Sequence, residues 1–478
     1  MDADPEPRAS LRSNETSHIT ILTTIFLILA LVALSTPARA QTCEELALEN
    51  AGLSAPDAAT TSLGADDFCG PPPRDWAAGT PPPPPFAAWT SAPAYVRREP
   101  RLASRLTGVL QRGDTVQVTA CMPDCKAAKA WAILGQDGAV PLRLLRPMPV
   151  PPEAYGTSAA ARYEYGKVPG GATPVFARPD PKAPVIRKEK VDFRLAFVPN
   201  PAQAQRGWLQ RPDGGWMRLR DVKLFAPSRF EGVHDGGQAA FVFVRRKAVL
   251  RVPTDPKVRA VKPTPEELLA RTVQRYDHLT LLGEKNGRVL VPGGSLPASV
   301  VRVVRPVPRP KGVAALDRWI HVDLQQQVLT AWEGDTRVFA TLVSTGKSDR
   351  KTTRTHEGTF RIYAKSVHTS MRGKPWDDYY AEEVPWTMHY DDGRALHGAY
   401  WHDQFGIEKS HGCINLSPAD AAWLFQWVPP HLPDGWHSVL AVSGKLPTAW
   451  VVVEDPGKVV RRPPGKVAVA AGALMASR

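Results

Sequence analysis

The sequence predicts a mainly β protein built from several small domains. Short runs rich in β-branched and aromatic residues recur from residue 94 onward and are separated by Gly- and Asp-containing turns, which is typical of strands. The clearest helical segment comes only near residue 418. The chain has 478 residues and 48 prolines, about twice the usual share of proline. Because this length exceeds one compact domain, we expect two to four domains joined by proline-rich linkers, like beads on a string.

Residues 1–40 have the pattern of an export signal. The apolar run Ile19–Leu34 is too short for a typical spanning helix, and it is followed by the small-x-small sequence Ala38-Arg39-Ala40. We therefore expect cleavage after Ala40 and a location in the periplasm or the cell wall. The segment before the run is not positively charged, so retention of the signal as an uncleaved membrane anchor is the alternative.

The formal net charge of the chain is +13. This excess favours solubility, and in an exported protein it also favours attraction to an anionic wall polymer. The sequence shows no helix-turn-helix, zinc-finger or aromatic RNA-binding motif, so we expect no nucleic-acid partner.

The five cysteines fall into two groups. Cys43, Cys69, Cys121 and Cys125 lie in the first quarter of the chain, whereas Cys413 stands alone. Outside the cytoplasm four of them can pair, with Cys121–Cys125 closing a local loop and Cys43–Cys69 as the second pair. A zinc site is the weaker alternative because the spacing matches no standard ligand pattern.

The first predicted β domain follows a proline-rich tether. Residues 41–93 form that tether, which ends in the polyproline run Pro81–Pro85. Within 94–150 the expected strands are 95–97, 106–110, 115–120, 130–134 and 140–145. The Leu-x-Arg-Gly-Asp turn ending at Asp114, together with Trp131 and a following Asp-Gly turn, resembles bacterial SH3-like domains of cell-wall proteins.

The pattern recurs twice more, in looser form. Residues 155–230 are expected to form a second SH3-like or β-rich domain, and residues 231–306 a third one with a helical insert near Pro265–Tyr276. No tight sequence period links them, so a single irregular β-rich domain over 155–306 is the alternative. The segment 307–317 is a linker.

Residues 318–453 form the last predicted domain, a β-sandwich-like body with a short helix. Two strands around a tight turn at 333–335 are followed by a third strand at 338–343, and further strands are expected at 355–362, 384–390 and 394–398. The helix Pro418–Trp427 has Ser417 as its N-cap and Asp420 in its first turn. The basic, Pro- and Ala-rich tail 454–478 is expected to be disordered.

The one unpaired cysteine lies among histidines. His397, His402 and His411 fall within sixteen residues of Cys413, and Gly412 allows a sharp turn beside it. A thiol attacks carbonyl groups as the thiolate, so it needs a lowered pKa and a nearby base. A metal site is a weaker hypothesis because no second cysteine or spaced histidine pair accompanies these residues. The other alternative is a buried cysteine with no function, near which the histidines lie by chance.

Two motifs in this segment carry a family resemblance. The pair His397-Gly398 is followed, after a gap, by the string Ser410-His411-Gly412-Cys413-Ile414-Asn415, and this pattern closely resembles the L,D-transpeptidase (YkuD-type) catalytic domain. The stretch Ser344-Thr345-Gly346 also looks like that family. His356 departs from it, because the family usually has proline there.

The resemblance implies a role for each matching residue. Cys413 is the nucleophile and His397 the general base, with the Gly398 carbonyl orienting the imidazole ring. His411 shapes the site. The N–H groups of Gly412 and Cys413 would stabilise the oxyanion.

Further positions are implied around this centre. Ser410 and Asn415 would form hydrogen bonds behind the nucleophile, whereas His402 is expected to be exposed. The resemblance also implies a set of residues that line the substrate cleft, for each of which core packing is an equally good explanation: Trp386, Met388, Tyr390, Tyr400 and Trp401.

The implied reaction links peptidoglycan stem peptides. The thiol attacks the bond between a diamino acid and a terminal D-Ala in a donor tetrapeptide, and the amine of an acceptor diamino acid resolves the thioester into a 3→3 cross-link. No metal or cofactor is expected. The alternatives are hydrolysis as an L,D-carboxypeptidase, transfer to another amine such as a protein lysine, or a non-catalytic scaffold that binds the cell wall through its SH3-like modules.

Overall fold

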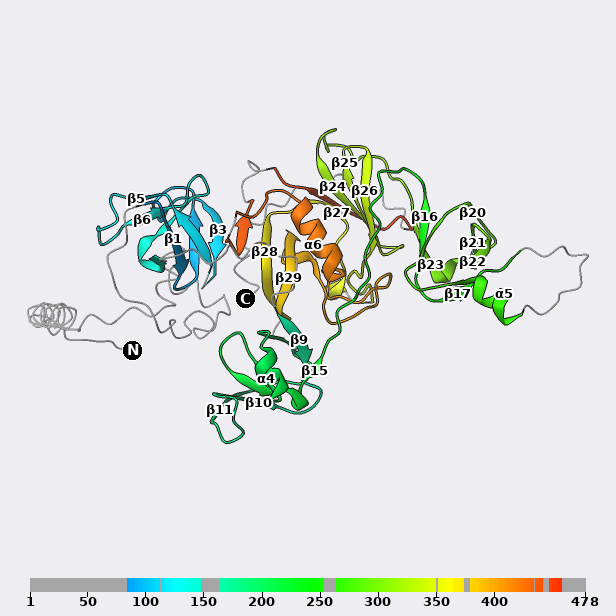
Figure 1. The fold of residues 1–478 in the computed structure, drawn as a ribbon. Helices are drawn as coiled ribbons and strands as arrows, with labels where there is room; N and C mark the ends of the chain where they lie inside the picture. Colours follow the sequence, from blue (N-terminus) through cyan, green and yellow to red (C-terminus); the bar gives the residue numbers. More distant parts are fainter. Residues whose placement is uncertain are drawn as a thin grey trace, which may run out of the picture.

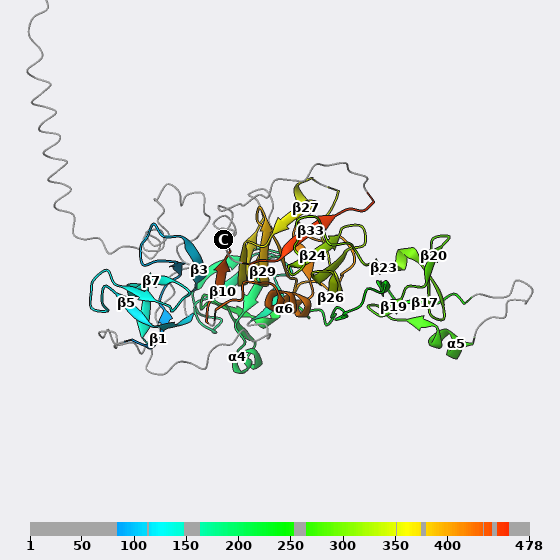
Figure 2. The same cartoon turned by 90° about the horizontal axis from the view of Figure 1, so that it is seen from above.

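The computed structural model describes residues 84–111, 114–147, 163–252, 264–349, 351–373, 379–433, 435–441 and 447–457. The fold is mainly β, as predicted (Figures 1 and 2). The expected signal at 1–40, most of the expected tether and nearly all of the expected tail lie outside the described residues. Among the described helices, none has the length and apolar character needed to cross a membrane.

The C-terminal domain is built from two sheets. The first has the strand order β26-β25-β24-β33-β27 and contains the antiparallel pairs β24–β25 and β25–β26, of which the second closes at the predicted turn 333–335. The second contains β28, β29, β30, β31 and β32. The bounds are β24 Arg318–Asp323, β25 Val328–Glu333, β26 Thr336–Leu342, η5 Lys351–Thr353, β27 Gly358–Arg361, β28 Ala364–Arg372, β29 Tyr380–Asp391, β30 Arg394–Gly398, β31 Ile414–Leu416, α6 Pro418–Trp427, β32 Ser438–Leu440 and β33 Trp450–Glu454.

Helix α6 has the predicted bounds and the predicted cap. The Ser417 hydroxyl accepts a hydrogen bond from the Asp420 N–H, and proline occupies the first turn, where its missing N–H costs nothing. Leu424 and Phe425 on this helix join a buried core with residues of both sheets, such as Ile320 and Leu396. Figure 1 shows α6 lying beside β28 and β29.

The first module, residues 84–147, has strands in all five predicted ranges, but the predicted strands 115–120 and 140–145 are each divided in two, and one further strand was not predicted. Strand β1 lies inside the expected tether, because Phe86, Ala88 and Thr90 alternate into a buried face. Cys121 and Cys125 form the expected local disulfide, whereas Cys43 and Cys69 lie outside the described residues. The bounds are β1 Phe86–Thr90, β2 Ala94–Arg97, β3 Leu106–Leu110, β4 Thr115–Val118, β5 Ala120–Met122, β6 Trp131–Ile133, β7 Ala139–Pro141, η2 Leu142–Leu144 and β8 Leu145–Pro147.

The second module, residues 163–225, is a small β unit with one short helix. Strand β10 pairs with β11 and β14, and β9 pairs with β12 and β15. The bounds are β9 Glu164–Lys167, β10 Thr173–Phe176, β11 Val185–Glu189, β12 Arg194–Phe197, α4 Pro201–Gln205, β13 Trp208–Gln210, β14 Trp216–Arg218, η3 Leu219–Asp221 and β15 Lys223–Leu224.

The third module, residues 240–304, carries the predicted helical insert. Helix α5 begins with a capping box in which Thr264 and Glu267 satisfy each other's backbone N–H groups. The bounds are β16 Phe241–Val244, β17 Ala248–Val249, α5 Pro265–Ala270, β18 Thr272–Val273, β19 His278–Thr280, β20 Gly283–Lys285, β21 Arg288–Val291, β22 Gly294–Pro297, η4 Ala298–Val300 and β23 Val301–Val304.

The three modules are not separate domains joined only by linkers, as was expected. Each one pairs a strand with the C-terminal domain or shares a buried cluster with it. Strand β3 pairs with β32, and β12 pairs in parallel with β29. Phe241 and Phe243 of the third module share a buried cluster with Leu342 and Phe405. The apolar surface that each small module cannot bury alone is therefore covered by the C-terminal domain.

Candidate active site

Two neighbouring strands bring the predicted catalytic residues together. Strand β30 runs parallel to β31, so that His397 lies opposite Asn415 and Gly398 opposite Leu416. Cys413 immediately precedes β31, and the Ala395 backbone on β30 acts to lower the pKa of its thiol. The sheet register thus places the cysteine two residues before the position on β31 that faces His397.

The loop that carries the cysteine rests on the predicted Ser-Thr-Gly stretch. The Ser344 backbone exchanges hydrogen bonds with Asn415, and the Ser410 N–H donates to the Thr345 carbonyl. A Cβ added at Gly346 would lie 2.7 Å from the Gly412 Cα, so the two backbones approach as closely as glycine alone permits. This contact explains why the two motifs, far apart in sequence, lie together.

Thr355 ties the same two segments with one hydroxyl. It is fully buried, accepts a hydrogen bond from the Gly346 N–H at 2.8 Å and donates to the Gly412 carbonyl at 2.9 Å. Sequence reasoning missed this role. Gly412 itself has a φ of +125°, a left-handed conformation that side chains other than glycine rarely adopt.

Ser410 occupies the backbone groups of the turn. Its hydroxyl donates to the Cys413 carbonyl and accepts from the Gly412 N–H at 3.0 Å. The expectation that the Gly412 N–H faces an oxyanion therefore needs correction, because this donor already has a partner in the structure. Gly412 serves the turn through its conformation.

His397 is buried and held in one orientation. Its Nδ1 lies 3.3 Å from the Gly398 carbonyl oxygen, which can only accept, so Nδ1 carries the proton and Nε2 is left as the basic nitrogen. Burial lowers the pKa of His397 to about 4, although the Gly398 carbonyl opposes this shift. The imidazole is therefore neutral at pH 7 and can accept a proton.

Cys413 differs from the expectation of a lowered pKa. The residue is half-buried, and burial raises the pKa of its thiol above the ordinary value. The Ala395 backbone and the Arg394 guanidinium act in the opposite direction. The resting groups are thus a thiol and a neutral imidazole, and the thiolate has to be formed by proton transfer.

Asn415 and His402 form a pair that the sequence did not suggest. His402 is half-buried rather than exposed, and its Nδ1 accepts from the Gln404 N–H at 3.2 Å. Its Nε2 lies 3.0 Å from the side-chain amide of Asn415. The Asn415 atom at this distance is Nδ2, whereas its Oδ1 has no partner among the described residues. Because a neutral ring with an acceptor at Nδ1 carries its proton at Nε2, turning the amide over would bring Oδ1 to that proton.

Most of the predicted cleft residues are core residues. Trp386 and Met388 belong to the main core of the C-terminal domain, and Tyr400 is buried against Tyr165 of the second module. Because these side chains are buried, they pack in the core and do not line an open substrate cleft. Trp401 is half-buried, with its ring centroid 5.7 Å from that of His397.

Tyr390 is packed in the core and also lies near the nucleophile. Its ring packs in the core against Phe360, but among the described residues its buried hydroxyl has no hydrogen-bond partner. Burial raises the pKa of this hydroxyl, and the nearby Cys413 adds to the shift. Tyr390 therefore lies within electrostatic reach of the thiol.

The exposed side of the site contains residues from elsewhere in the fold. The exposed His411 ring lies 4.7 Å from the Tyr379 ring. His356, which departs from the family pattern, contacts Asp391 at 2.9 Å, and Asp391 also binds Arg394. No group of three or more His, Cys, Asp or Glu side chains in the described part of the chain is arranged to hold a metal ion.

A comparison with protein families identifies one segment of the chain. Residues 317–459 match YkuD, the L,D-transpeptidase catalytic domain. Over 125 residues the chain is 25% identical to "Putative L,D-transpeptidase YciB" of Bacillus subtilis (strain 168), and this match covers 24% of the chain and 62% of that protein.

Solved structures give matches of similar extent. The L,D-transpeptidase (Yku) from Stackebrandtia nassauensis is 25% identical, with 30% of this chain and 60% of that chain covered and a TM-score of 0.22. The catalytic domain from the E. faecium L,D-transpeptidase is 25% identical, with 29% of this chain and 98% of that chain covered and a TM-score of 0.23. The chain spans less than two thirds of the length of the Bacillus and Stackebrandtia relatives.

The matched segment contains strands β30 and β31 and the whole turn that carries Cys413. Residues 317–459 are therefore an L,D-transpeptidase catalytic domain of the YkuD family.

Proposed function

We propose that this protein is a cysteine-dependent L,D-transpeptidase that forms 3→3 cross-links between peptidoglycan stem peptides. The observation that supports this most strongly is the parallel pairing of β30 with β31, which brings the segment that begins with Cys413 next to the strand of a buried imidazole whose Nε2 is the basic nitrogen. An acyl transfer through a thioester needs this pair and no cofactor.

The first half of the reaction forms the acyl-enzyme. His397 Nε2 takes the thiol proton, and the Cys413 sulfur attacks the carbonyl carbon that links the diamino acid to D-Ala. The Cys413 N–H is the proposed donor to the oxyanion, since the Gly412 N–H is bound by Ser410. The C–N bond then breaks, and the D-Ala nitrogen leaves with the proton from His397.

The second half resolves the thioester. The side-chain amine of an acceptor diamino acid attacks the thioester carbonyl while His397 accepts its proton. The C–S bond breaks, the sulfur recovers a proton from His397, and the new amide is the cross-link. Because the pair begins and ends neutral, the buried site holds a charge pair only during turnover.

Arg394 and His411 have supporting roles in this scheme. The Arg394 guanidinium lies beside Gly412 and favours the thiolate, because an opposite charge stabilises the ionised form. The exposed His411 ring, against Tyr379, is placed to contact bound peptide. Ser410 and Asn415 hold the turn and the strand that position the nucleophile.

Export to the periplasm or cell wall belongs to the same proposal, because the substrate lies there and residues 1–40 have the pattern of a signal. The domain limits at 41–93, 94–150, 155–230, 231–306 and 307–317 remain predictions, as does the SH3-like character of the modules. Wall binding by these modules is proposed on the net charge of +13 alone.

The reaction can be tested with the protein lacking residues 1–40 and a purified disaccharide-tetrapeptide. We expect cross-linked dimer and released D-Ala from the wild type and from His431→Gln, an exposed-histidine control, and neither from Cys413→Ala or His397→Gln. Tripeptide without dimer would favour the alternative of L,D-carboxypeptidase activity. Dimer from Cys413→Ala would contradict the proposed mechanism.

A further inference from the structure

We propose that Arg194, supplied by the second module, is a substrate-binding residue that recognises a carboxylate of the donor stem peptide. The inference rests on the proposed function. It assigns to a module outside the matched catalytic segment a direct part in the active site.

The backbone of Arg194 is fixed against the catalytic domain. It is the first residue of β12, and it pairs with Ala381 on β29 in a parallel bridge. Two residues further along, the Ala196 N–H donates to the Glu382 carboxylate at 2.9 Å. The start of β12 thus continues the sheet that contains β29.

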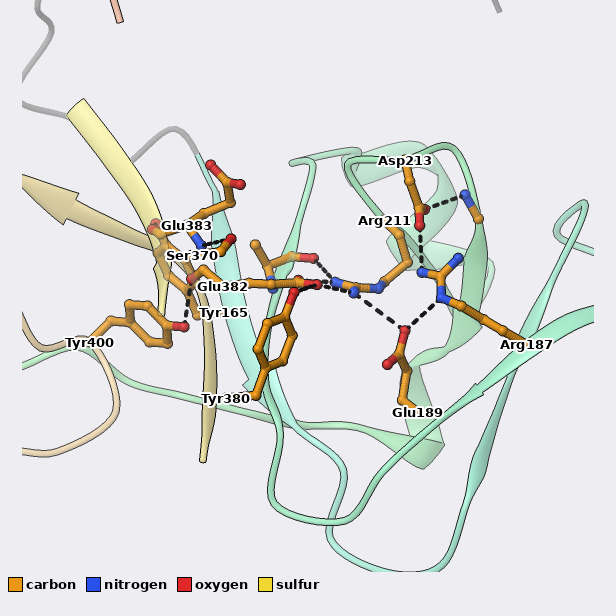
Figure 3. Close-up of polar contacts among 12 residues, drawn as sticks. Tyr165, Arg187, Glu189, Arg211, Asp213, Ser370, Tyr380, Glu382, Glu383 and Tyr400 are labelled. Carbon is orange, nitrogen blue, oxygen red and sulfur yellow. Dashed lines mark hydrogen bonds and ion pairs between the residues drawn. The ribbon is translucent and has the colours of Figure 1, made fainter. Parts of the chain in front are cut away.

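A buried ion pair holds the same junction. Figure 3 shows Arg211 of the second module pointing at Glu382 of β29, and the two N–O distances are 2.5 and 2.6 Å. Tyr165 and Tyr400 stack beside it, with their ring centroids 3.7 Å apart, and the Tyr165 hydroxyl donates to the Glu383 carbonyl. A junction with this much buried polar and aromatic contact leaves the module little freedom to turn away.

The side chain of Arg194 lies against two rings at the site. Its guanidinium carbon is 4.8 Å from the Tyr379 ring centroid and 5.2 Å from that of Trp401. The Tyr379 ring contacts His411, and the Trp401 ring contacts His397. Arg194 is therefore one aromatic ring away from each of the two catalytic motifs.

The charge of Arg194 has no partner at ion-pair distance among the described residues. Its charge helps to lower the pKa of Asp192, but that carboxylate lies 2.6 Å from Lys167. The guanidinium field also reaches the site, since it contributes to the lowered pKa of His402. An arginine stacked on aromatic faces keeps the edge of its planar fork available for a carboxylate.

The proposed donor peptide supplies suitable anions. Its terminal D-Ala carries a carboxylate next to the bond that Cys413 attacks, and its diamino acid can carry a second one. Both present the same chemistry to a guanidinium. The alternative is that Arg194 only packs on the two rings, and this alternative predicts no preference for charged substrate.

The test compares three donors with four proteins. The donors are the disaccharide-tetrapeptide with free carboxylates, the same donor with the terminal carboxylate amidated, and the donor with the diamino-acid carboxylate amidated. The proteins are the wild type, Arg194→Gln, Arg194→Lys and the control Arg220→Gln, which changes an arginine in the same module whose side chain is 76% exposed. Reaction of Cys413 with iodoacetamide, which carries no carboxylate, reports on the thiol in each protein.

We expect Arg194→Gln to raise KM for the free-carboxylate donor about 10- to 100-fold, with kcat little changed and with the alkylation rate unchanged. On the donor amidated at the recognised carboxylate, wild type and variant should be equal, and this donor identifies which of the two carboxylates is bound. Arg194→Lys should recover part of the loss, and Arg220→Gln should match the wild type.

The proposal is overturned if Arg194→Gln has an unchanged KM for the free donor, or if it loses the same factor on all three donors, as a packing role would predict. A wild-type protein that is alkylated at Cys413 but converts none of the donors would contradict the proposed function itself, and the inference with it.

Discussion

Arg211 and Glu382 form a bidentate ion pair across the junction between the second module and strand β29, with N–O distances of 2.5 and 2.6 Å (Figure 3). The Arg211 side chain is only 2% exposed. Burial acts to raise the pKa of Glu382, but the ion pair outweighs it and holds that pKa below the ordinary value. The carboxylate also accepts hydrogen bonds from Ala196 and Tyr380, so its buried charge is well satisfied, whereas the Arg211 Nε–H has no partner among the described residues.

Replacing one member of this pair should strongly destabilise the protein. Glu382→Gln removes the bidentate counter-ion of the buried Arg211 and leaves only Glu189, at 3.4 Å, so we expect a loss of about 3–5 kcal/mol in the free energy of unfolding, measured by chemical denaturation. The matched control is Asp335→Asn, which breaks the surface pair with Arg309 and should cost under about 1 kcal/mol. Equal effects of the two variants would contradict the assigned importance of the buried pair.

The Arg394→Gln variant should make the Cys413 thiol harder to ionise. The guanidinium lowers the pKa of Cys413 against the effect of burial, so its removal should shift the pH profile of alkylation by iodoacetamide to higher pH. The profile of Arg318→Gln, which removes a cation stacked on Trp427, should match that of the wild type. An unshifted profile for Arg394→Gln would show that the guanidinium does not act on the thiol.

The Thr355→Val variant should loosen the turn that carries the nucleophile. It keeps the shape of the side chain but leaves the Gly346 N–H and the Gly412 carbonyl without this partner. We expect a loss of about 1–3 kcal/mol in the free energy of unfolding, together with slower acylation of Cys413. Thr355→Ser, which keeps the hydroxyl, should recover most of both. A valine variant with wild-type stability and acylation would count against the role assigned to this hydroxyl.

Asp420 should make stability depend on pH in a defined direction. Burial raises its pKa to about 6, against about 3.9 in an unfolded chain, while hydrogen bonds from Thr341 and Gly232 oppose the shift. Between these two values the folded state binds more protons than the unfolded state, so this residue's contribution is fully present below about pH 4 and is lost as the pH rises through 6.

The isosteric Asp420→Asn variant removes that dependence. Relative to the wild type, it should gain on the order of 2–3 kcal/mol in the free energy of unfolding between pH 4 and pH 7, because it cannot ionise. Thermal or chemical unfolding of both proteins at the two pH values measures the difference. A constant difference between them would show that the carboxyl group does not titrate in this range.

Local signals in the sequence predicted much of the catalytic domain. The Asp-Gly turn at 391–393 and its alternating flanks predicted the β29–β30 hairpin, and Ser417 predicted the start of α6. Nothing comparable marked β33, which pairs in parallel with β24 across the whole domain, because a strand partner distant in sequence leaves no local pattern.

In the site too, residues with a local sequence signal were predicted and residues brought in by folding were not. The motifs identified Cys413, His397 and Gly398, whose spacing is local. Buried hydrogen-bond partners such as Thr355 and stacked residues such as Arg194 come from other elements and meet the site only after folding. The family resemblance left Trp386 and Tyr400 open between substrate contact and core packing, because the core and a binding surface use the same residue types, and the structure buries both.

The most direct test of the central claim is mass spectrometry of the protein lacking residues 1–40 after incubation with disaccharide-tetrapeptide. We predict a transient adduct on Cys413 whose mass equals the donor minus D-Ala, followed by cross-linked dimer, and the loss of both in Cys413→Ala with the protein still folded. A folded and reduced wild-type protein that forms neither adduct nor dimer would contradict the claim and favour a domain that binds the cell wall without catalysis.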